Sequence, residues 1–262
     1  MPSYPILQVD VFTDIPLGGN PCAVLFNADD LTDDDMLSIA REMNLSETAF
    51  IRKTVNGDFA ARYFTPAEEI PFAGHPTIAT VAAITDQQLF NIRSVYSTII
   101  IELKIGKIEV EIYAPQGRIQ QITMLQNKPE FLSILNPQDV VGVFGLEQTD
   151  LLPDAPIQIV STGTPQLMIP VSDLAVLERI NIDIPAYLKL RNKERFFSPH
   201  LFCLKGATPA GRTFARHFGV PPDTPEDPFT GSATGGMAAY LWHYGLIVKS
   251  WACQYKEKAT PQ

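Results

Sequence analysis

FAGHPTIATVAAI (residues 72–84) and EDPFTGSATGGMAAYLW (residues 226–242) are the two stretches that decide the fold of this chain. Each begins with a possible proton-transfer group among small residues and then enters an apolar run without charges, over residues 78–84 and 237–242. Such a pattern predicts a helix whose first turn offers unpaired backbone N–H groups and the positive end of the helix dipole. Each helix start would therefore suit a carboxylate or a developing enolate.

The two predicted helix starts also carry side chains suited to proton transfer. His75 belongs to the first and Asp227 to the second, and Ser232 is expected to cap the second helix. If the two starts face each other across a cleft, they would hold an anionic substrate between acid and base groups. The backbone N–H groups expected to stabilise the anion are those of Gly74, Thr77, Ser232, Ala233 and Thr234. This arrangement is typical of an enzyme.

Composition narrows the class of protein. The chain has 262 residues, 45% hydrophobic and 19% charged, enough for one large domain or two smaller ones with their own cores. The net charge of −9, without clusters of Lys and Arg, argues against a nucleic-acid surface. No stretch approaches the roughly 20 apolar residues of a membrane helix, and the first residues lack a signal-peptide pattern. The cysteines are three and widely spaced, which favours a reducing compartment, so we expect a cytoplasmic protein.

Hydrophobic patterning and turn residues predict further strands and helices. Thr32 is expected to cap a helix with three aspartates in its first turn, and Asn136 and Pro137 to begin a short one. Two more short helices are predicted over residues 173–179 and 186–190. The predicted strands cover residues 6–13, 22–26, 48–53, 59–64, 97–103, 107–113, 119–125, 157–161, 166–171 and 196–204.

The two charge-free helices predict the architecture. A helix that is apolar on all sides is enclosed by other elements, and its alanines permit close approach of surrounding strands. The chain therefore reads as two half-molecules of an α+β fold, each with strands around a buried helix, and with a site between them. A linker-like break at residues 114–117 predicts domains over residues 1–115 and 118–262.

Several motifs resemble those of the PhzF-like (phenazine biosynthesis) family. They occur in family order at residues 9–13, 19–24, 45–50, 62–66, 74–77 and 226–233. The resemblance implies a diaminopimelate-epimerase-like fold: two pseudo-symmetric halves, each a mostly antiparallel sheet or barrel wrapped around a central helix. It also implies cofactor-independent isomerase or epimerase chemistry, with no metal, and a possible homodimer. Residues 250–262 depart from the family pattern and look like a divergent, shortened ending.

By the same resemblance, Glu47 is the principal acid/base, and His75, Asp227 and Ser232 are its partners across the cleft. Burial in an apolar cleft would raise the pKa of Glu47 toward neutrality, with Pro21, Phe50 and Phe72 as candidate walls. The helix dipole should lower the pKa of His75 and keep its imidazole neutral. The residues expected to bind substrate are Asn20, Gly74, Thr77, Gly231, Ala233 and Thr234. Specificity is expected to come from loop residues such as Asn20, Thr65, Gln166 and Arg212.

Other reaction classes fit the sequence less well. Thr230 replaces the first glycine of a G-x-S-x-G elbow around Ser232, which disfavours a hydrolase. The four histidines show no ligand spacing with cysteine or acidic partners, which disfavours a metal site. A thiol-based racemase would need cysteines at the two helix starts, and neither stretch has one.

Three functions stay open at this point. The first is an isomerase in which Glu47 takes a proton from an activated carbon of a small carboxylate-bearing metabolite, and the proton returns elsewhere. The second is an epimerase of the amino-acid type that uses the same groups at a single carbon. The third is a binding or interaction protein that keeps the fold but has an impaired site.

Overall fold

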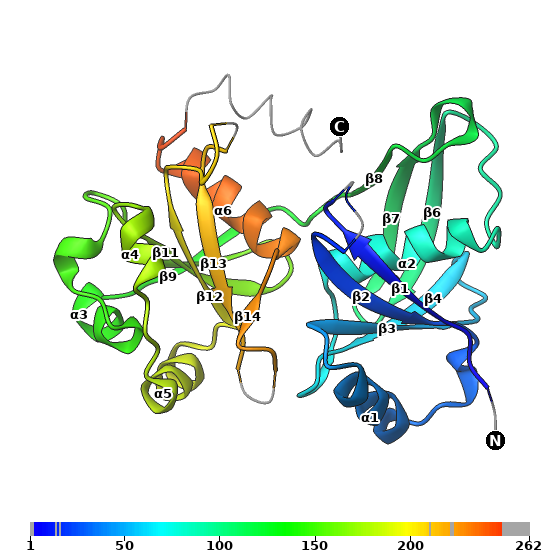
Figure 1. Ribbon diagram of the computed structural model, residues 1–262, viewed down its shortest axis with the longest axis horizontal. Coiled ribbons are helices and arrows are strands. Elements are labelled where there is room, and N and C mark those ends of the chain that lie inside the picture. The colour runs from blue at the N-terminus through cyan, green and yellow to red at the C-terminus, as the bar shows by residue number, and fades with distance from the viewer. Residues whose placement is uncertain (1–2, 14, 16, 210, 221–222, 248–262) are drawn as a thin grey trace.

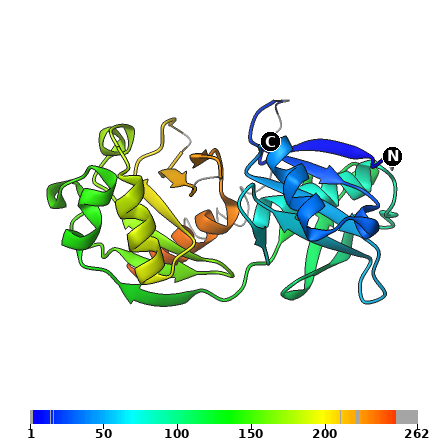
Figure 2. The same cartoon turned by 90° about the horizontal axis from the view of Figure 1, so that it is seen from below.

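The structure, a computed structural model, describes residues 3–13, 15, 17–209, 211–220 and 223–247. The predicted divergence of residues 250–262 lies outside this part of the chain. Two β-sheets stand side by side, one built by each half of the sequence, and helices pack on both (Figures 1 and 2). The α+β fold class expected from the sequence is confirmed.

The first sheet has the strand order β1-β2-β3-β4-β6-β7-β8, with the short β5 paired to β4. Most neighbours are antiparallel, whereas β2 with β3 and β4 with β6 run parallel. The strands are β1 (Ile6–Val11), β2 (Asn20–Leu25), β3 (Glu47–Arg52), β4 (Phe59–Phe64), β5 (Glu69–Ile70), β6 (Tyr96–Leu103), β7 (Gly106–Tyr113) and β8 (Gln121–Met124).

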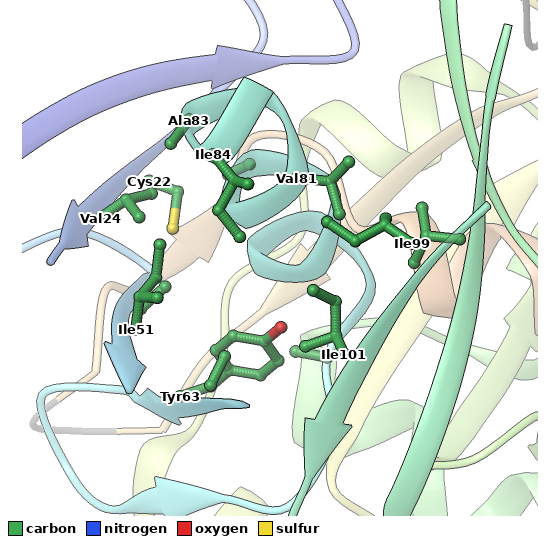
Figure 3. Close-up of a cluster of buried hydrophobic side chains, with 14 of the residues drawn as sticks. Cys22, Val24, Ile51, Tyr63, Val81, Ala83, Ile84, Ile99 and Ile101 are labelled. Carbon is green, nitrogen blue, oxygen red and sulfur yellow. The ribbon is translucent and has the colours of Figure 1, made fainter. Parts of the chain in front are cut away.

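Helix α2 (Gly74–Asp86) lies inside the curve of the first sheet and provides its main core. Ile84 points from the helix toward Cys22 and Ile51, and Val81 lies on the side of Ile99; these three partners are buried side chains of the strands (Figure 3). On the other face of the sheet, α1 (Asp33–Met43) packs through Met36 and its neighbours. Strands therefore surround α2, as its charge-free run over residues 78–84 predicts.

Helix α1 begins where the sequence places it. The Thr32 side chain accepts a hydrogen bond from the Asp35 backbone N–H, and the Asp35 carboxylate accepts one from the Thr32 backbone N–H. This capping box satisfies two donors of the first turn. The helix ends at Asn44, whose left-handed backbone (φ 52°) turns the chain directly into β3 and so brings Glu47 to the start of that strand.

The second sheet has the order β14-β13-β12-β11-β10-β9, antiparallel except for β11 with β12. Its strands are β9 (Glu130–Ile134), β10 (Gln158–Ser161), β11 (Pro165–Pro170), β12 (Ser198–Cys203), β13 (Phe214–Phe218) and β14 (Glu226–Asp227). Its helices are α3 (Pro137–Val140), α4 (Leu174–Glu178), α5 (Ile184–Glu194) and α6 (Gly231–His243). The short 3-10 helices of the chain are Ala28–Asp30, Pro115–Gly117, Val141–Phe144 and Gln148–Asp150.

The second sheet is covered on both faces. Helix α6 packs on one face through Met237, Tyr240 and Leu241, which meet Met168 and Phe202 of the sheet. A separate core, which includes side chains of α3, α4 and α5, fills the other face. Helix α6 is less enclosed than α2, because the Trp242 side chain on its outer side is 49% exposed.

Two observations refine the predicted layout. Strands β5, β9, β13 and β14 were not expected from the sequence. Strand β8 falls in the expected second domain, residues 118–262, but pairs with β7 in the first sheet. By strand pairing, the first half therefore reaches Met124, and a division into domains over residues 1–115 and 118–262 stays a prediction.

Candidate active site

A cavity of about 440 Å³ lies between the two halves. From the first half its wall includes Ser46, Glu47, Thr65, Phe72 and Ala73. From the second half it includes Gln166, Ser198, His217, Asp223, Asp227 and Ser232. The cavity therefore exists only while the two halves are together, and carboxylates from both sides border it, Glu47 from the first half and Asp223 and Asp227 from the second.

Glu47 lies against His75 at the wall of the first half. Oε2 of Glu47 is 2.7 Å from Nδ1 of His75, and the two side chains are 14% and 3% exposed. No described donor reaches Oε2 in hydrogen-bond geometry, so this is a close ion-pair contact rather than an aligned hydrogen bond. His75 is positioned by the first turn of α2, and Glu47 by the start of β3.

The neighbours of His75 favour its protonated form. Burial alone would lower the pKa of His75, but the Glu47 carboxylate and the Cys22 side chain outweigh this effect, and the pKa is raised well above its ordinary value. The predicted lowering of this pKa is therefore wrong. The charge of Glu47 at contact distance acts more strongly on the imidazole than the helix dipole does.

Asp227 is held by donors from both halves. Its Oδ1 accepts hydrogen bonds from Asn20 Nδ2 at 2.6 Å and from Ser46 Oγ at 2.9 Å, and Thr230 Oγ1 donates to Oδ2. Burial raises the pKa of Asp227, and the nearby Glu47 carboxylate raises it further. The protein therefore brings two carboxyl groups together and makes one of them harder to ionise.

The starts of α2 and α6 meet. A Cβ atom built on Gly74 would lie 3.4 Å from the backbone N of Ser232, so the first turns of the two helices lie side by side with room for little more than a Cβ atom between them. Neither cap residue, Ala73 or Thr230, makes a side-chain hydrogen bond to its helix. The cap of α6 is Thr230 and not Ser232, which instead is the second residue of the helix, so that part of the prediction is wrong.

The predicted site residues fall into three groups. Glu47, Asp227 and Ser232 border the cavity, and so do Thr65 and Gln166 of the specificity candidates. Asn20 and His75 are buried behind these residues, where Asn20 donates a hydrogen bond to Asp227 and His75 contacts Glu47. The remaining residues, which are Gly74, Thr77, Gly231, Ala233, Thr234 and Arg212, are not among the residues that line the cavity.

Three details differ from the expected substrate contacts. The Thr234 backbone N–H donates to Thr230 O within the helix and so is already paired. Of the predicted apolar walls only Phe72 borders the cavity, while Phe50 packs toward α1 and Pro21 does not line it. Asn20 and Gln166 belong to strands β2 and β11, not to loops.

Sequence reasoning missed several residues of the cavity wall. Ser46 binds Asp227, and His217 is the register partner of Asp227 on the neighbouring strand. The signal for Ser46 is its place directly before Glu47. His217 gives less signal, because the strand that carries it was not predicted.

Some classes of site are not formed by the described residues. None of their His, Cys, Asp and Glu side chains gather in groups of three or more that could hold a metal ion. No helix in this part of the chain has both the length and the apolar character that crossing a membrane requires.

Comparison with known proteins assigns the family. A family profile described as "Phenazine biosynthesis-like protein" (PhzC-PhzF) matches residues 9–260. The chain belongs to this family. The resemblance inferred from the motifs is thereby confirmed.

Named relatives of this PhzC-PhzF chain are isomerases. The uncharacterized isomerase YfhB of Bacillus subtilis is 34% identical over 242 residues, which cover 92% of this chain and 81% of YfhB. The trans-2,3-dihydro-3-hydroxyanthranilate isomerase of Pseudomonas chlororaphis is 33% identical over 245 residues, or 91% of this chain and 80% of the relative. A PhzF-family crystal structure from Bacillus anthracis has a TM-score of 0.77 at 32% identity and covers 90% of this chain and 79% of its own. The chain is thus an enzyme of the isomerase class.

Proposed function

We propose that this PhzC-PhzF enzyme is a cofactor-independent isomerase that moves a proton between carbon atoms of a small carboxylate-bearing metabolite. The observation that carries the proposal is the meeting of Glu47 and Asp227, from opposite halves, at one cavity. Two carboxyl groups with different environments can divide the roles of base and acid. Neither role requires a bound metal or an organic cofactor.

Glu47 is the group that would take the proton from carbon. Its charged neighbour His75 is buried behind it, so His75 acts as a positioning residue that fixes the carboxylate and balances its charge. Asp227, whose pKa is raised by burial and by Glu47, is the second proton-transfer group. The C–H bond broken at one carbon is replaced by a C–H bond at another, and the enzyme ends with the protons it began with.

The helix starts supply the anion site. Ser232 borders the cavity in the first turn of α6, and Gly74, in the first turn of α2, lies next to Ser232. Both first turns lack side-chain caps, so their N–H groups and dipoles can face a carboxylate. As negative charge spreads during carbanion formation, the same donors would stabilise it.

The proposal is tested by following the migrating hydrogen. The first compound to try is trans-2,3-dihydro-3-hydroxyanthranilate, the compound in the name of the Pseudomonas chlororaphis relative. In heavy water, NMR should show deuterium at a carbon other than the one that loses its proton. Deuterium at the original carbon alone would favour the epimerase.

Replacing the base gives the second arm of this test. Glu47→Gln should lower kcat by about 10²- to 10⁴-fold while substrate still binds, because the amide cannot accept the proton. Glu109→Gln on β7, where the side chain is exposed, is the matched control and should leave kcat unchanged. Equal activity in both variants contradicts the assignment of Glu47. A parent protein that binds carboxylates yet turns none over would favour the binding-protein alternative.

We further propose that the enzyme works as a cytoplasmic homodimer. The family resemblance and the widely spaced cysteines support this proposal, and Cys22 and Cys203 are buried as free thiols. Light scattering of the purified protein should give twice the 29.0 kDa mass of one chain.

A further inference from the structure

Cys22 is buried beside the pair that Glu47 forms with His75. On the parallel strands β2 and β3, Cys22 is the register partner of Glu47, and paired residues share a face of the sheet. Figure 3 shows the Cys22 sulfur pointing from β2 toward α2, the helix that carries His75. The Cys22 and His75 side chains interact directly. Three elements of the first half therefore bring a carboxylate, an imidazole and a thiol together.

The charged ring of His75 has one N–H group that no carboxylate satisfies. Its Nδ1 lies 2.7 Å from Oε2 of Glu47, whereas its buried Nε2 has no aligned hydrogen-bond partner among the described residues. A protonated imidazole carries a proton on both ring nitrogens. Burying a cationic N–H group without an acceptor is costly. The charged form of His75 therefore needs an acceptor besides Glu47.

The sulfur of Cys22 can act as this acceptor. Its S–H donates to the backbone carbonyl of Ala23 at 3.5 Å, so the lone pairs of the sulfur remain for the ring. Burial raises the pKa of Cys22, which therefore stays a neutral thiol and is not a second anion beside Glu47. Sulfur is a weak acceptor, so its contact with His75 is looser than an aligned N–H···O bond.

The other ionisable groups around His75 come from three further places. Burial disfavours the charge on the ring, and Glu47 of β3 favours it. Asp227 of the second half interacts with the same charge. Tyr63 of β4 acts on Cys22, and burial raises the pKa of Tyr63, so its phenol stays neutral. Cys22 is thus the uncharged side chain that supports the protonated ring.

We propose that Cys22 is a positioning residue, whose sulfur accepts the second N–H of the His75 imidazolium and keeps that ring charged and fixed against Glu47. Cys22 is fully buried and is not among the residues that line the cavity, so it acts through His75 and not on the substrate. The inference rests on the proposed function for the role of Glu47, but the charge state of His75 can be measured without any turnover.

NMR titration of the histidine ring nitrogens tests the proposal directly. In the unaltered protein His75, identified by the signal that His75→Asn loses, should be charged at pH 7. Cys22→Val fills the place of the thiol but offers no acceptor, so it should lower the pKa of His75 by about 1. Cys22→Ser keeps an acceptor at this position and should leave that pKa nearly unchanged. A purely structural role of Cys22 would not produce this difference.

Cys203 provides the matched control in the second half. It is also fully buried, and its S–H donates to the backbone carbonyl of Lys205 at 3.3 Å. Cys203→Val should therefore leave the pKa of His75 unchanged. Thermal unfolding would confirm that each variant is folded at the temperature of measurement, and Cys22→Ala takes the place of Cys22→Val if the valine variant is not.

The pH dependence of turnover gives a second readout. If the charged ring is required, the alkaline limb of the kcat/KM profile should lie about 1 pH unit lower in Cys22→Val, a roughly tenfold loss above that limb. Cys22→Ser should restore the original limb. The proposal is overturned if His75 is neutral at pH 7 in the unaltered protein, or if the valine and serine variants give it the same pKa. An active Glu47→Gln would refute the proposed function and leave the NMR result standing, so the two proposals fail separately.

Discussion

Gly74 of the first half lies so close to Ser232 of the second half that a Cβ atom at position 74 would already be in van der Waals contact with the Ser232 nitrogen, at 3.4 Å, which leaves no room for a branched side chain. Both residues belong to the first turns of the helices around which the halves are built. The spacing of the two halves at the cavity is therefore set by main-chain atoms. A cleft fixed in this way holds Glu47 and Asp227 at a defined separation.

A larger side chain at position 74 should lower the activity of the enzyme. We expect Gly74→Val to push the two helix starts apart and to lower kcat/KM by about 10- to 100-fold, because small displacements of reacting groups have effects of that size. Steady-state kinetics would measure the loss. Gly142→Val is the control, since a Cβ at that position has open space around it, and it should leave kcat/KM unchanged.

Asn20 links the two halves through Asp227. Its Nδ2 donates to Asp227 Oδ1 at 2.6 Å and to Phe229 O at 2.7 Å, and the residue is fully buried. Asn20→Ala should cost about 2 kcal/mol of unfolding free energy, because buried acceptors lose their donor. It should also raise the pKa of Asp227, because the ionised carboxylate loses a hydrogen bond. Urea unfolding and the pH–rate profile would test the two effects, with exposed Asn56→Ala as control.

Acid should destabilise the fold through its buried histidines. In the folded protein the pKa of His200 is about 4, below the ordinary 6.5. The unfolded chain therefore binds a proton at this residue more readily than the folded chain, and the contribution of His200 to the free energy of unfolding, complete above pH 6.5, is lost as the pH falls toward 4. Asp227 has a raised pKa in the folded protein, so its protonation at low pH adds to the free energy of unfolding and opposes this loss. His75 also has a raised pKa, and its contribution to stability is lost only as the pH rises above 6.5. The difference in unfolding free energy between pH 7.0 and 4.5 should shrink by about 2 kcal/mol in His200→Leu. An unchanged difference would contradict the conclusion that His200 is neutral in the folded protein at pH 7.

A core substitution should weaken the fold and spare the site. Ile84 is fully buried in α2, ten residues and about 15 Å along the helix from Gly74. Ile84→Ala should lower the free energy of unfolding by about 2–5 kcal/mol, through lost burial and the cavity that remains. At temperatures well below the melting point, kcat should stay within about threefold of the unaltered enzyme. A loss of kcat as large as that of Glu47→Gln would show that the site depends on the core directly.

Local signals in the sequence were enough for several elements. Helix α1 could be predicted because its cap, its acidic first turn and its apolar stripe all lie within residues 32–43. The hairpin of β6 and β7 could be predicted because Gly106 adopts the positive φ (123°) that its turn requires. The family motifs pointed to Glu47 and Asp227, which the structure places at one cavity.

Elements that depend on distant partners were missed. Strand β13 contains Arg216 and His217, polar residues whose partners, Glu226 and His200, come from other strands. Strand β9 is an edge strand, and its Leu132 and Ile134 remain 43% and 62% exposed, so it lacks the buried alternation that identifies a strand. The pKa of His75 was misjudged for a related reason, since the contact with Glu47 exists only after β3 and α2 have packed.

Gln166, Ser198 and His217 line the cavity from β11, β12 and β13 of the second half and are distinct from Glu47 and Asp227, the two proposed proton-transfer groups. These three positions of the wall can therefore change while both proton-transfer groups are kept. Libraries confined to positions 166, 198 and 217 should yield enzymes with new substrates and the same reaction. In this architecture, enzymes with new substrates would arise by substitutions on one wall of the cavity, while Glu47 and Asp227 stay unchanged.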